Sequence, residues 1–215
     1  MERAQFLLGK EMDQDFLVLD THIESMDAMI LKIQVRYEIL QLLNVVKLFD
    51  QEEIDHITYA QKWIASGVEI FRIEKPAIPD VHLVCYCVLI DESACKILLV
   101  DHKKAGLWLP SGGHVEVNEH PKESVKRELF EELRIDAEFL LEDPLFVTVT
   151  KTGGLTSGHT DVSFWYVLKG DSTIDINYDT EEFERVCWFD FEAIPYENTD
   201  PHMKRFIRKF QTYGR

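Results

Sequence analysis

The chain has 215 residues, of which 46% are hydrophobic and 29% charged, a composition typical of a globular protein that buries its core without disulfide bonds. Its 39 acidic and 23 basic residues give a formal net charge of −16. This charge argues against a sequence-independent grip on nucleic acid or on an anionic membrane, because both need clustered lysine and arginine. It also repels phosphorylated small molecules unless bound cations screen the acidic side chains.

The N-terminal residues and the cysteines indicate a protein of the cytoplasm. The first fifteen residues include Glu2, Glu11, Asp13 and Asp15, which do not fit the basic start of a signal peptide. No apolar run approaches the roughly 18 residues of a membrane span. The four cysteines have spacings that match no zinc motif, so free thiols in a reducing compartment are expected.

Residues 21–70 are expected to form two antiparallel helices. Residues 21–24 resemble a capping box, and an apolar face follows at helical spacing, formed by Met26, Ile30, Ile33, Tyr37 and Leu40. Residues 50–53 form a second helix start. The prolines at 76 and 79 then break the pattern. We therefore expect an N-terminal helical region over residues 1–75 and a second domain over residues 76–215.

The second domain alternates strands and helices, which predicts an α/β fold. Residues 108–113 form a glycine-rich turn. Pro121–Leu133 is expected to be a helix, with proline in the first turn where its missing N–H costs little. The other expected elements are strands at 82–90, 96–101, 145–150, 161–168 and 185–189 and a closing helix at 201–213.

Three carboxylates share one side of the expected helix. Glu128 and Glu132 are one turn apart, and Glu131 lies beside them. Like charges at this spacing destabilise a helix by a few tenths of a kcal/mol per pair unless a cation binds there. Hard divalent cations prefer oxygen ligands, and the turn at Gly113 allows the backbone to approach them. The pattern favours a divalent metal site over a solvated acidic face.

Residues 113–135 resemble the Nudix box. Its pattern is Gly, five residues, Glu, seven residues, Arg-Glu, an apolar residue, any residue, Glu-Glu, any residue, Gly and an apolar residue. The sequence departs from it once, at Arg134, which stands where the pattern has glycine. The resemblance extends from residue 82 to 210 and includes the segments 107–110 and 158–166. It is closest to bacterial Nudix proteins that carry a helical N-terminal extension.

The resemblance implies a Nudix α/β/α sandwich with a mixed sheet, and hydrolysis of a nucleoside diphosphate linked to another moiety X. Mg²⁺ or Mn²⁺ would be the cofactor. The main metal ligands would be Glu128 and Glu132, joined by Glu131 and the carbonyl of Gly113. Arg127 would pair with Glu119 and hold the catalytic loop to the helix. The candidates for the general base are Glu131 and Glu182.

Substrate recognition is expected before the strand at 161–168. His159 and Asp161 have two possible interpretations: they select the substrate, or they belong to a core strand that Asp161 caps. Trp108 either lines the site or packs over the loop, and packing is favoured; His114 is read as a loop residue. The expected partner is a small nucleotide-diphosphate substrate. The N-terminal helices are expected to pack on the catalytic domain or to form a homodimer, because their apolar faces are wide.

Two other functions stay open at this point. A non-catalytic Nudix-fold module that senses nucleotides would have a degenerate carboxylate row, whereas this one is complete. An isomerase acting on an isoprenoid diphosphate would need a proton donor such as Cys85 or Cys87. The identity of X is also open, because selectivity depends on loops outside the box: ADP-ribose, nucleoside triphosphates, sugar nucleotides, CDP-alcohols and dinucleoside polyphosphates all fit.

Overall fold

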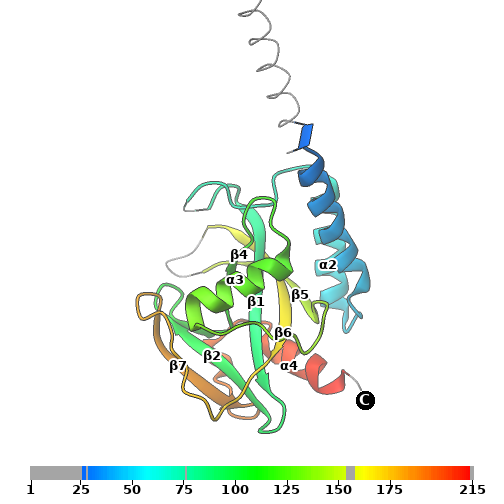
Figure 1. Ribbon diagram of the computed structural model, residues 1–215. Helices are drawn as coiled ribbons and strands as arrows, with labels where there is room; N and C mark the ends of the chain where they lie inside the picture. Colours follow the sequence, from blue (N-terminus) through cyan, green and yellow to red (C-terminus); the bar gives the residue numbers. More distant parts are fainter. Residues whose placement is uncertain (1–25, 28, 76, 154–157, 214–215) are drawn as a thin grey trace, which may run out of the picture.

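The computed structural model describes residues 26–27, 29–75, 77–153 and 158–213. The expected capping box at 21–24 lies outside these residues. Among the described residues no helix has the length and apolarity to cross a membrane. A central sheet carries helices on both sides (Figure 1). A helix over 29–45 is followed by α2 (Gln51–Ala65), β1 (Val81–Asp91), β2 (Lys96–His102), β3 (Leu107–Leu109), β4 (Ser111–His114), α3 (Pro121–Leu133), β5 (Phe146–Lys151), β6 (Thr160–Lys169), β7 (Phe183–Asp190), the short 3₁₀ helix η2 (Tyr196–Asn198) and α4 (Met203–Thr212).

The seven strands form one mixed sheet, as expected. Its main path runs β3-β2-β1-β6-β5, while β4 pairs with β1 and β7 pairs with β2. The pair β1 and β6 is parallel, and the other strand pairs are antiparallel. The expected glycine-rich turn at 108–113 is in fact two short strands, β3 and β4. β4 pairs with β1 through four residues and so places the glycine bend beside the centre of the sheet.

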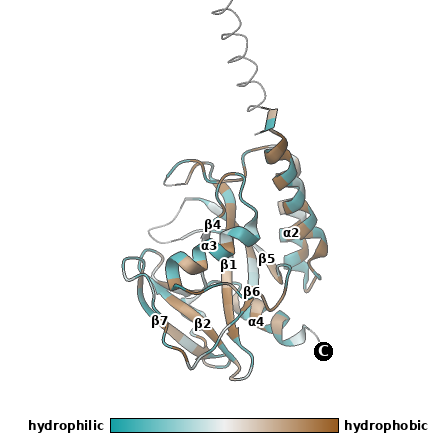
Figure 2. Ribbon diagram, viewed as in Figure 1, coloured by the Kyte–Doolittle hydropathy of each residue, from teal (hydrophilic) through white to brown (hydrophobic). Residues whose placement is uncertain are grey.

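Alternation along β1 divides the core between the two faces of the sheet. Leu83 and Cys85 belong to the cluster that contains the α3 side chains, and Val88 and Ile90 to the cluster that contains the α4 side chains. Hydrophobic residues therefore run along the whole strand (Figure 2). This arrangement confirms the α/β/α sandwich.

The N-terminal helices join the cluster on the α3 face, but through a different stripe from the one expected. The helix over 29–45 buries Val35, Ile39 and Leu43. Ile33 and Tyr37, on the expected face, are 60% and 61% exposed. Met26 and Ile30 are exposed as well, while Leu40 is partly buried. The expectation was wrong because this helix has two apolar stripes at helical spacing, and spacing alone does not say which one meets the sheet.

Ion pairs tie α2 to the last helix of the chain. Asp50 caps α2 by accepting a hydrogen bond from the Glu53 backbone N–H, and its carboxylate also binds Arg205 of α4. The buried Glu53 accepts two hydrogen bonds, of 2.7 and 2.8 Å, from Lys209 Nζ. The helix start predicted at residues 50–53 is thus confirmed. The division into regions 1–75 and 76–215 stays a prediction.

Candidate functional site

Helix α3 is fixed at both ends by local backbone chemistry. The imidazole of His120 caps its first turn by accepting a hydrogen bond from the Lys122 N–H, and Pro121 occupies the first helical position. The helix ends at Arg134, whose φ of 56° lies in the left-handed region. The Nudix pattern has glycine at this position, and the conformation explains that preference.

Glu132 is held against the glycine bend. Its Oε2 accepts hydrogen bonds from Ser111 Oγ at 2.6 Å and from the Gly112 N–H at 2.9 Å. The side chain is almost fully buried. Burial raises the pKa of Glu132 to about 8, even though both hydrogen bonds favour the ionised form. A cation beside this carboxylate would favour the charged form and lower that pKa again.

Glu128 lies one turn earlier and packs directly on Gly113. A Cβ at Gly113 would come within 2.5 Å of Glu128 Oε1, so only glycine lets β4 approach the carboxylate this closely. Burial raises the pKa of Glu128, while the hydrogen bond from Arg127 Nη1 at 2.8 Å opposes the rise. Glu131 differs from both, because its side chain is 58% exposed. The row therefore consists of one buried carboxylate, Glu132, one half-buried carboxylate, Glu128, and one exposed at its solvent edge, Glu131.

Arg127 holds the loop to the helix, as the sequence predicts. Its Nε and Nη2 donate to the two oxygens of Glu119 at 3.0 and 2.8 Å. The same Nη2 donates to the His114 carbonyl at 3.1 Å. Glu119 also accepts from Ser124 Oγ at 2.5 Å and from the Glu116 N–H at 3.0 Å. The two-pronged guanidinium contact fixes the loop after β4 relative to the carboxylates.

Glu182 lies in a loop that approaches the same helix. The Asp179 N–H donates to the Glu132 carbonyl at 2.8 Å, and the Lys103 N–H donates to the Glu182 carbonyl at 3.0 Å. The charge of Glu182 adds to the rise in pKa that burial causes at Glu128 and Glu132. The structure thus brings this half-buried acid near the carboxylate row, although it is about 50 residues away in sequence.

His159 and Asp161 lie together on the other face of the sheet. Asp161 Oδ1 is 3.3 Å from Nε2 of both His159 and His82. His114 completes the group, with its ring centroid 4.8 Å from that of His82. Burial, with nearby Arg72, lowers the pKa of His114 to about 3, so its imidazole is neutral at neutral pH.

Sequence reasoning did not find His82, Arg72 or the role of His114. In sequence these residues lie in a strand, a linker and a loop. Only the parallel pairing of β1 with β6, which sets His82 opposite Asp161, brings them together. The signal available was the period-two alternation, which puts His82 on the same side of β1 as Val84 and Tyr86.

Trp108 is not part of this histidine group. It lies on β3, and β2 and β1 separate that strand from β6. The Trp108 ring packs against the Phe189 ring, with 5.0 Å between the two ring centroids. The Arg185 guanidinium lies over the Trp108 ring, 5.1 Å from its centroid. The structure therefore places Trp108 in a packing environment on the edge of the sheet.

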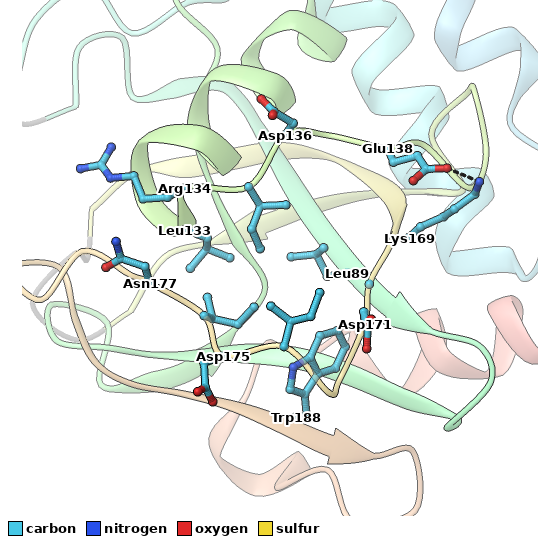
Figure 3. Close-up of a pocket in the computed structure, with 14 residues that line it drawn as sticks. Leu89, Leu133, Arg134, Asp136, Glu138, Lys169, Asp171, Asp175, Asn177 and Trp188 are labelled. Atoms are coloured by element: carbon cyan, nitrogen blue, oxygen red, sulfur yellow. Dashed lines mark hydrogen bonds and ion pairs between the residues drawn. The ribbon is translucent and has the colours of Figure 1, made fainter.

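A cavity of about 390 Å³ opens at the C-terminal end of α3, away from the carboxylates. In Figure 3, Leu89, Leu133 and Trp188 lie around it, while the Glu138–Lys169 ion pair stands at its rim. None of the three carboxylates lines it. We therefore build the functional site on α3 and β4 and not on this cavity.

A helix that holds a row of carboxylates against a glycine bend, in an α/β/α sandwich, defines a class of hydrolases that act through divalent cations. The family model of the NUDIX domain matches residues 81–210, more than half of the chain, and the chain belongs to this family. The resemblance found in the sequence is confirmed. The protein is a Nudix-type hydrolase of phosphorus-containing anhydrides, and Nudix hydrolases generally use divalent metal ions.

Several solved structures are similar to the chain. The Escherichia coli dihydroneopterin triphosphate pyrophosphohydrolase is 15% identical with a TM-score of 0.50, and the match covers 60% of this chain and 93% of that one. A MutT NUDIX hydrolase from Burkholderia pseudomallei is 22% identical, with a TM-score of 0.47 and coverage of 59% and 95%. An Ap4A hydrolase from Caenorhabditis elegans is 19% identical, with a TM-score of 0.47 and coverage of 60% and 96%. No curated protein matches the chain.

Proposed function

We propose that the protein hydrolyses the diphosphate linkage of a small nucleoside diphosphate derivative joined to a moiety X, with Mg²⁺ or Mn²⁺ as cofactor. The observation that carries the proposal is the position of the buried Glu132 and the half-buried Glu128 against the bend at Gly112 and Gly113. Burial raises the pKa of both carboxyl groups, so their charged forms are costly there unless a cation lies beside them. The donor set consists of oxygens, which suits these hard ions.

Each residue of the row has a distinct proposed role. Glu128 and Glu132 bind the metal, and Glu131 and the Gly113 carbonyl add further ligands. Bound ions would neutralise charge on the phosphoryl oxygens and acidify the attacking water. Arg127 acts as a positioning residue, because it contacts Glu119, Glu128 and the loop backbone together. Glu131 and Glu182 are the two candidate bases; Glu131 is exposed to solvent and Glu182 is half-buried.

Glu132→Gln provides the test. The variant keeps an oxygen that can accept from Ser111 and Gly112 and removes the charge that a cation needs. We expect Mg²⁺-dependent hydrolysis to fall at least about 100-fold, the scale seen when one charge-stabilising group is removed. Release of nucleoside monophosphate and far-UV circular dichroism would be measured together.

The matched control is Glu123→Gln on the same helix. Glu123 is exposed and pairs only with Lys126 among the described residues, so its loss should leave hydrolysis within about twofold of the wild type. A folded Glu132→Gln variant with full activity would contradict the proposed metal site. The same assay, run with ADP-ribose, nucleoside triphosphates, sugar nucleotides, CDP-alcohols and dinucleoside polyphosphates, tests the substrate class.

The alternatives find less support. The carboxylate row is complete, which does not favour a non-catalytic sensor. Cys85 and Cys87 are fully buried, and their thiols contact the carbonyls of Gly113 and Val125 at 3.7 and 3.5 Å. Burial also raises the pKa of Cys87 well above its usual value. Neither thiol is exposed to act on an isoprenoid diphosphate.

A further inference from the structure

A second set of metal-ligand atoms lies on the face of the sheet opposite α3. His82, His114, His159 and Asp161 each offer one such atom, and all four atoms lie within 4.8 Å of one another. They come from β1, β4, the residue before β6, and β6 itself. The strand register explains the meeting, because Asp161 pairs with His82 and His114 pairs with Val84.

Three of these atoms are buried and have no hydrogen-bond partner among the residues that the structure describes. They are His82 Nε2, His114 Nε2 and Asp161 Oδ1, and the side chain of His82 is 0% exposed. A buried polar atom left unsatisfied costs about 1–3 kcal/mol. Three such atoms that face one another indicate a common binding partner at their centre, and not a surface cluster of polar side chains.

The spacing suits a metal better than direct hydrogen bonds. Asp161 Oδ1 lies 3.3 Å from Nε2 of both His82 and His159, yet its geometry to His82 is not that of a hydrogen bond. Two ligands at about 2.0–2.1 Å from a tetrahedral Zn²⁺ would be about 3.3 Å apart. The two separations from Asp161 Oδ1 match that value, and all four ligand atoms lie within 4.8 Å of one another.

The other ring nitrogens fix the tautomers that a metal requires. His82 Nδ1 is 2.8 Å from the Pro79 carbonyl, to which it can only donate, so its Nε2 carries a lone pair. His159 Nδ1 is 3.2 Å from Thr152 Oγ1. That hydroxyl directs its own hydrogen to the His159 carbonyl at 3.1 Å and therefore accepts from the ring. Metal-binding histidines typically have such partners.

We propose that His82, His114, His159 and Asp161 bind a divalent transition metal of the Zn²⁺ type. Imidazole nitrogens suit Zn²⁺ rather than Mg²⁺, and four protein ligands close a tetrahedral shell as in structural sites. The ion would join β1, β4 and β6 one residue from Gly113. This site is separate from the carboxylate row and does not depend on the proposed hydrolysis.

The competing occupant is a phosphate or another part of the substrate, the role that the sequence predicts for His159 and Asp161. The Arg72 guanidinium is near the group, because the charge of Asp161 acts on it. Its positive charge would favour an anion. The carboxylate of Asp161 at the centre of the group would repel it. With neutral rings, the three imidazoles and one carboxylate carry one negative charge, so the ligand atoms themselves favour a cation, although the charges of Arg72 and Lys75 near His114 oppose it.

Metal binding to the full chain tests the proposal. The protein would be stripped with a chelator and titrated with Co²⁺ while its visible spectrum is recorded, and with Zn²⁺ while its melting temperature is followed. We expect one tight equivalent of either ion, the visible bands of tetrahedral Co²⁺, and a rise in melting temperature with Zn²⁺. Absence of the bands and of the rise in the wild type would overturn the proposal.

Variants locate the site. Asp161→Asn and His159→Gln should weaken Co²⁺ binding at least about 100-fold, more than the 10–100-fold typical of outer partners. Glu132→Gln in the carboxylate row should keep the bands, which separates this test from that of the proposed hydrolysis. His56→Gln is the matched control, because His56 belongs to a second group with Glu52 and His202.

Two outcomes of the variant series would refute the site. Loss of the bands in His56→Gln, with Asp161→Asn unchanged, would move the metal to the group at His56. A raised KM in Asp161→Asn, with no tight Co²⁺ bound to the wild type, would assign the group to substrate binding instead.

Discussion

At the scale of single residues, Arg134 has a left-handed backbone conformation, and its side chain makes few contacts that would offset the cost. Its φ is 56°, and its guanidinium makes a 3.3 Å hydrogen bond to the Phe130 carbonyl at the surface. The left-handed region costs a non-glycine residue roughly 1–2 kcal/mol. The departure from the Nudix pattern therefore affects stability and leaves every proposed metal ligand in place.

Arg134→Gly should therefore raise the free energy of unfolding by about 1 kcal/mol, because glycine adopts this conformation without the Cβ clash. Urea denaturation would measure the change, and hydrolysis should be unaltered. The matched control is Arg134→Ala, which removes the same guanidinium and keeps the Cβ; its stability should stay within about 0.5 kcal/mol of the wild type. Equal stabilisation by both substitutions would show that the side chain, and not the backbone, is responsible.

The carboxylate row also shows which residue properties the sequence determines. Helical spacing correctly predicted that Glu128 and Glu132 share one side, because that depends only on neighbours along the helix. It did not predict that Glu132 is buried while Glu131 is exposed, since this difference comes from Ser111 and Gly112 on a separate strand. The histidine group was missed for the same reason, as it needs three strands to be paired.

At the scale of elements, the junction of α2 with α4 depends on charge. Asp50 caps α2 and pairs with Arg205, and the hydrogen bond from Arg205 lowers the pKa of Asp50 from 3.8 to about 2. An acid whose pKa is lower in the folded state than in the unfolded state stabilises the fold at pH values above 3.8. That contribution is lost as the pH falls from 3.8 through 2.

Asp50→Asn should reveal this contribution. Asparagine keeps the helix cap and removes the charge, so the variant should lose about 1 kcal/mol of stability at pH 7, a modest value because Asp50 is 34% exposed. The loss should shrink as the pH falls below 3.8 and vanish only below pH 2. Chemical denaturation across this range would measure it. Asp55→Asn, an exposed acid on the same helix, should show no such pH dependence; a loss for Asp50→Asn that is constant with pH would contradict the assignment.

Most elements follow from sequence periodicity, and the exceptions have physical causes. Pro121–Leu133 is a helix from end to end as predicted, because its cap, proline and apolar stripe agree. β3 and β4 were read as one turn, since strands of three and four residues with glycine carry too little pattern. These short strands exist because they pair with β2 and β1, which no local signal reports.

At the scale of the whole molecule, the N-terminal helices and the Nudix domain share buried side chains. Val35, Ile39 and Ile64 lie in the same cluster as residues of β1 and α3. The other apolar stripe of the first helix, including Ile33 and Tyr37, is exposed. The homodimer expected from the sequence stays a prediction, and light scattering of the full chain would test it.

Removal of residues 1–75 should prevent the rest of the chain from folding stably. The truncation would strip one side of the shared core and leave Lys209, which is 4% exposed, without Glu53. The truncation also removes buried apolar side chains such as Ile57 and Ile64, each worth about 1.5–3 kcal/mol, a large part of the 5–15 kcal/mol that stabilises a typical domain. Gel filtration and circular dichroism of residues 76–215 should show aggregation or loss of structure.

Co-expression of residues 1–75 as a separate chain should restore a folded complex, because the same contacts can form between two chains. A monomer of residues 76–215 with full stability would instead show that the Nudix domain folds independently of its N-terminal helices.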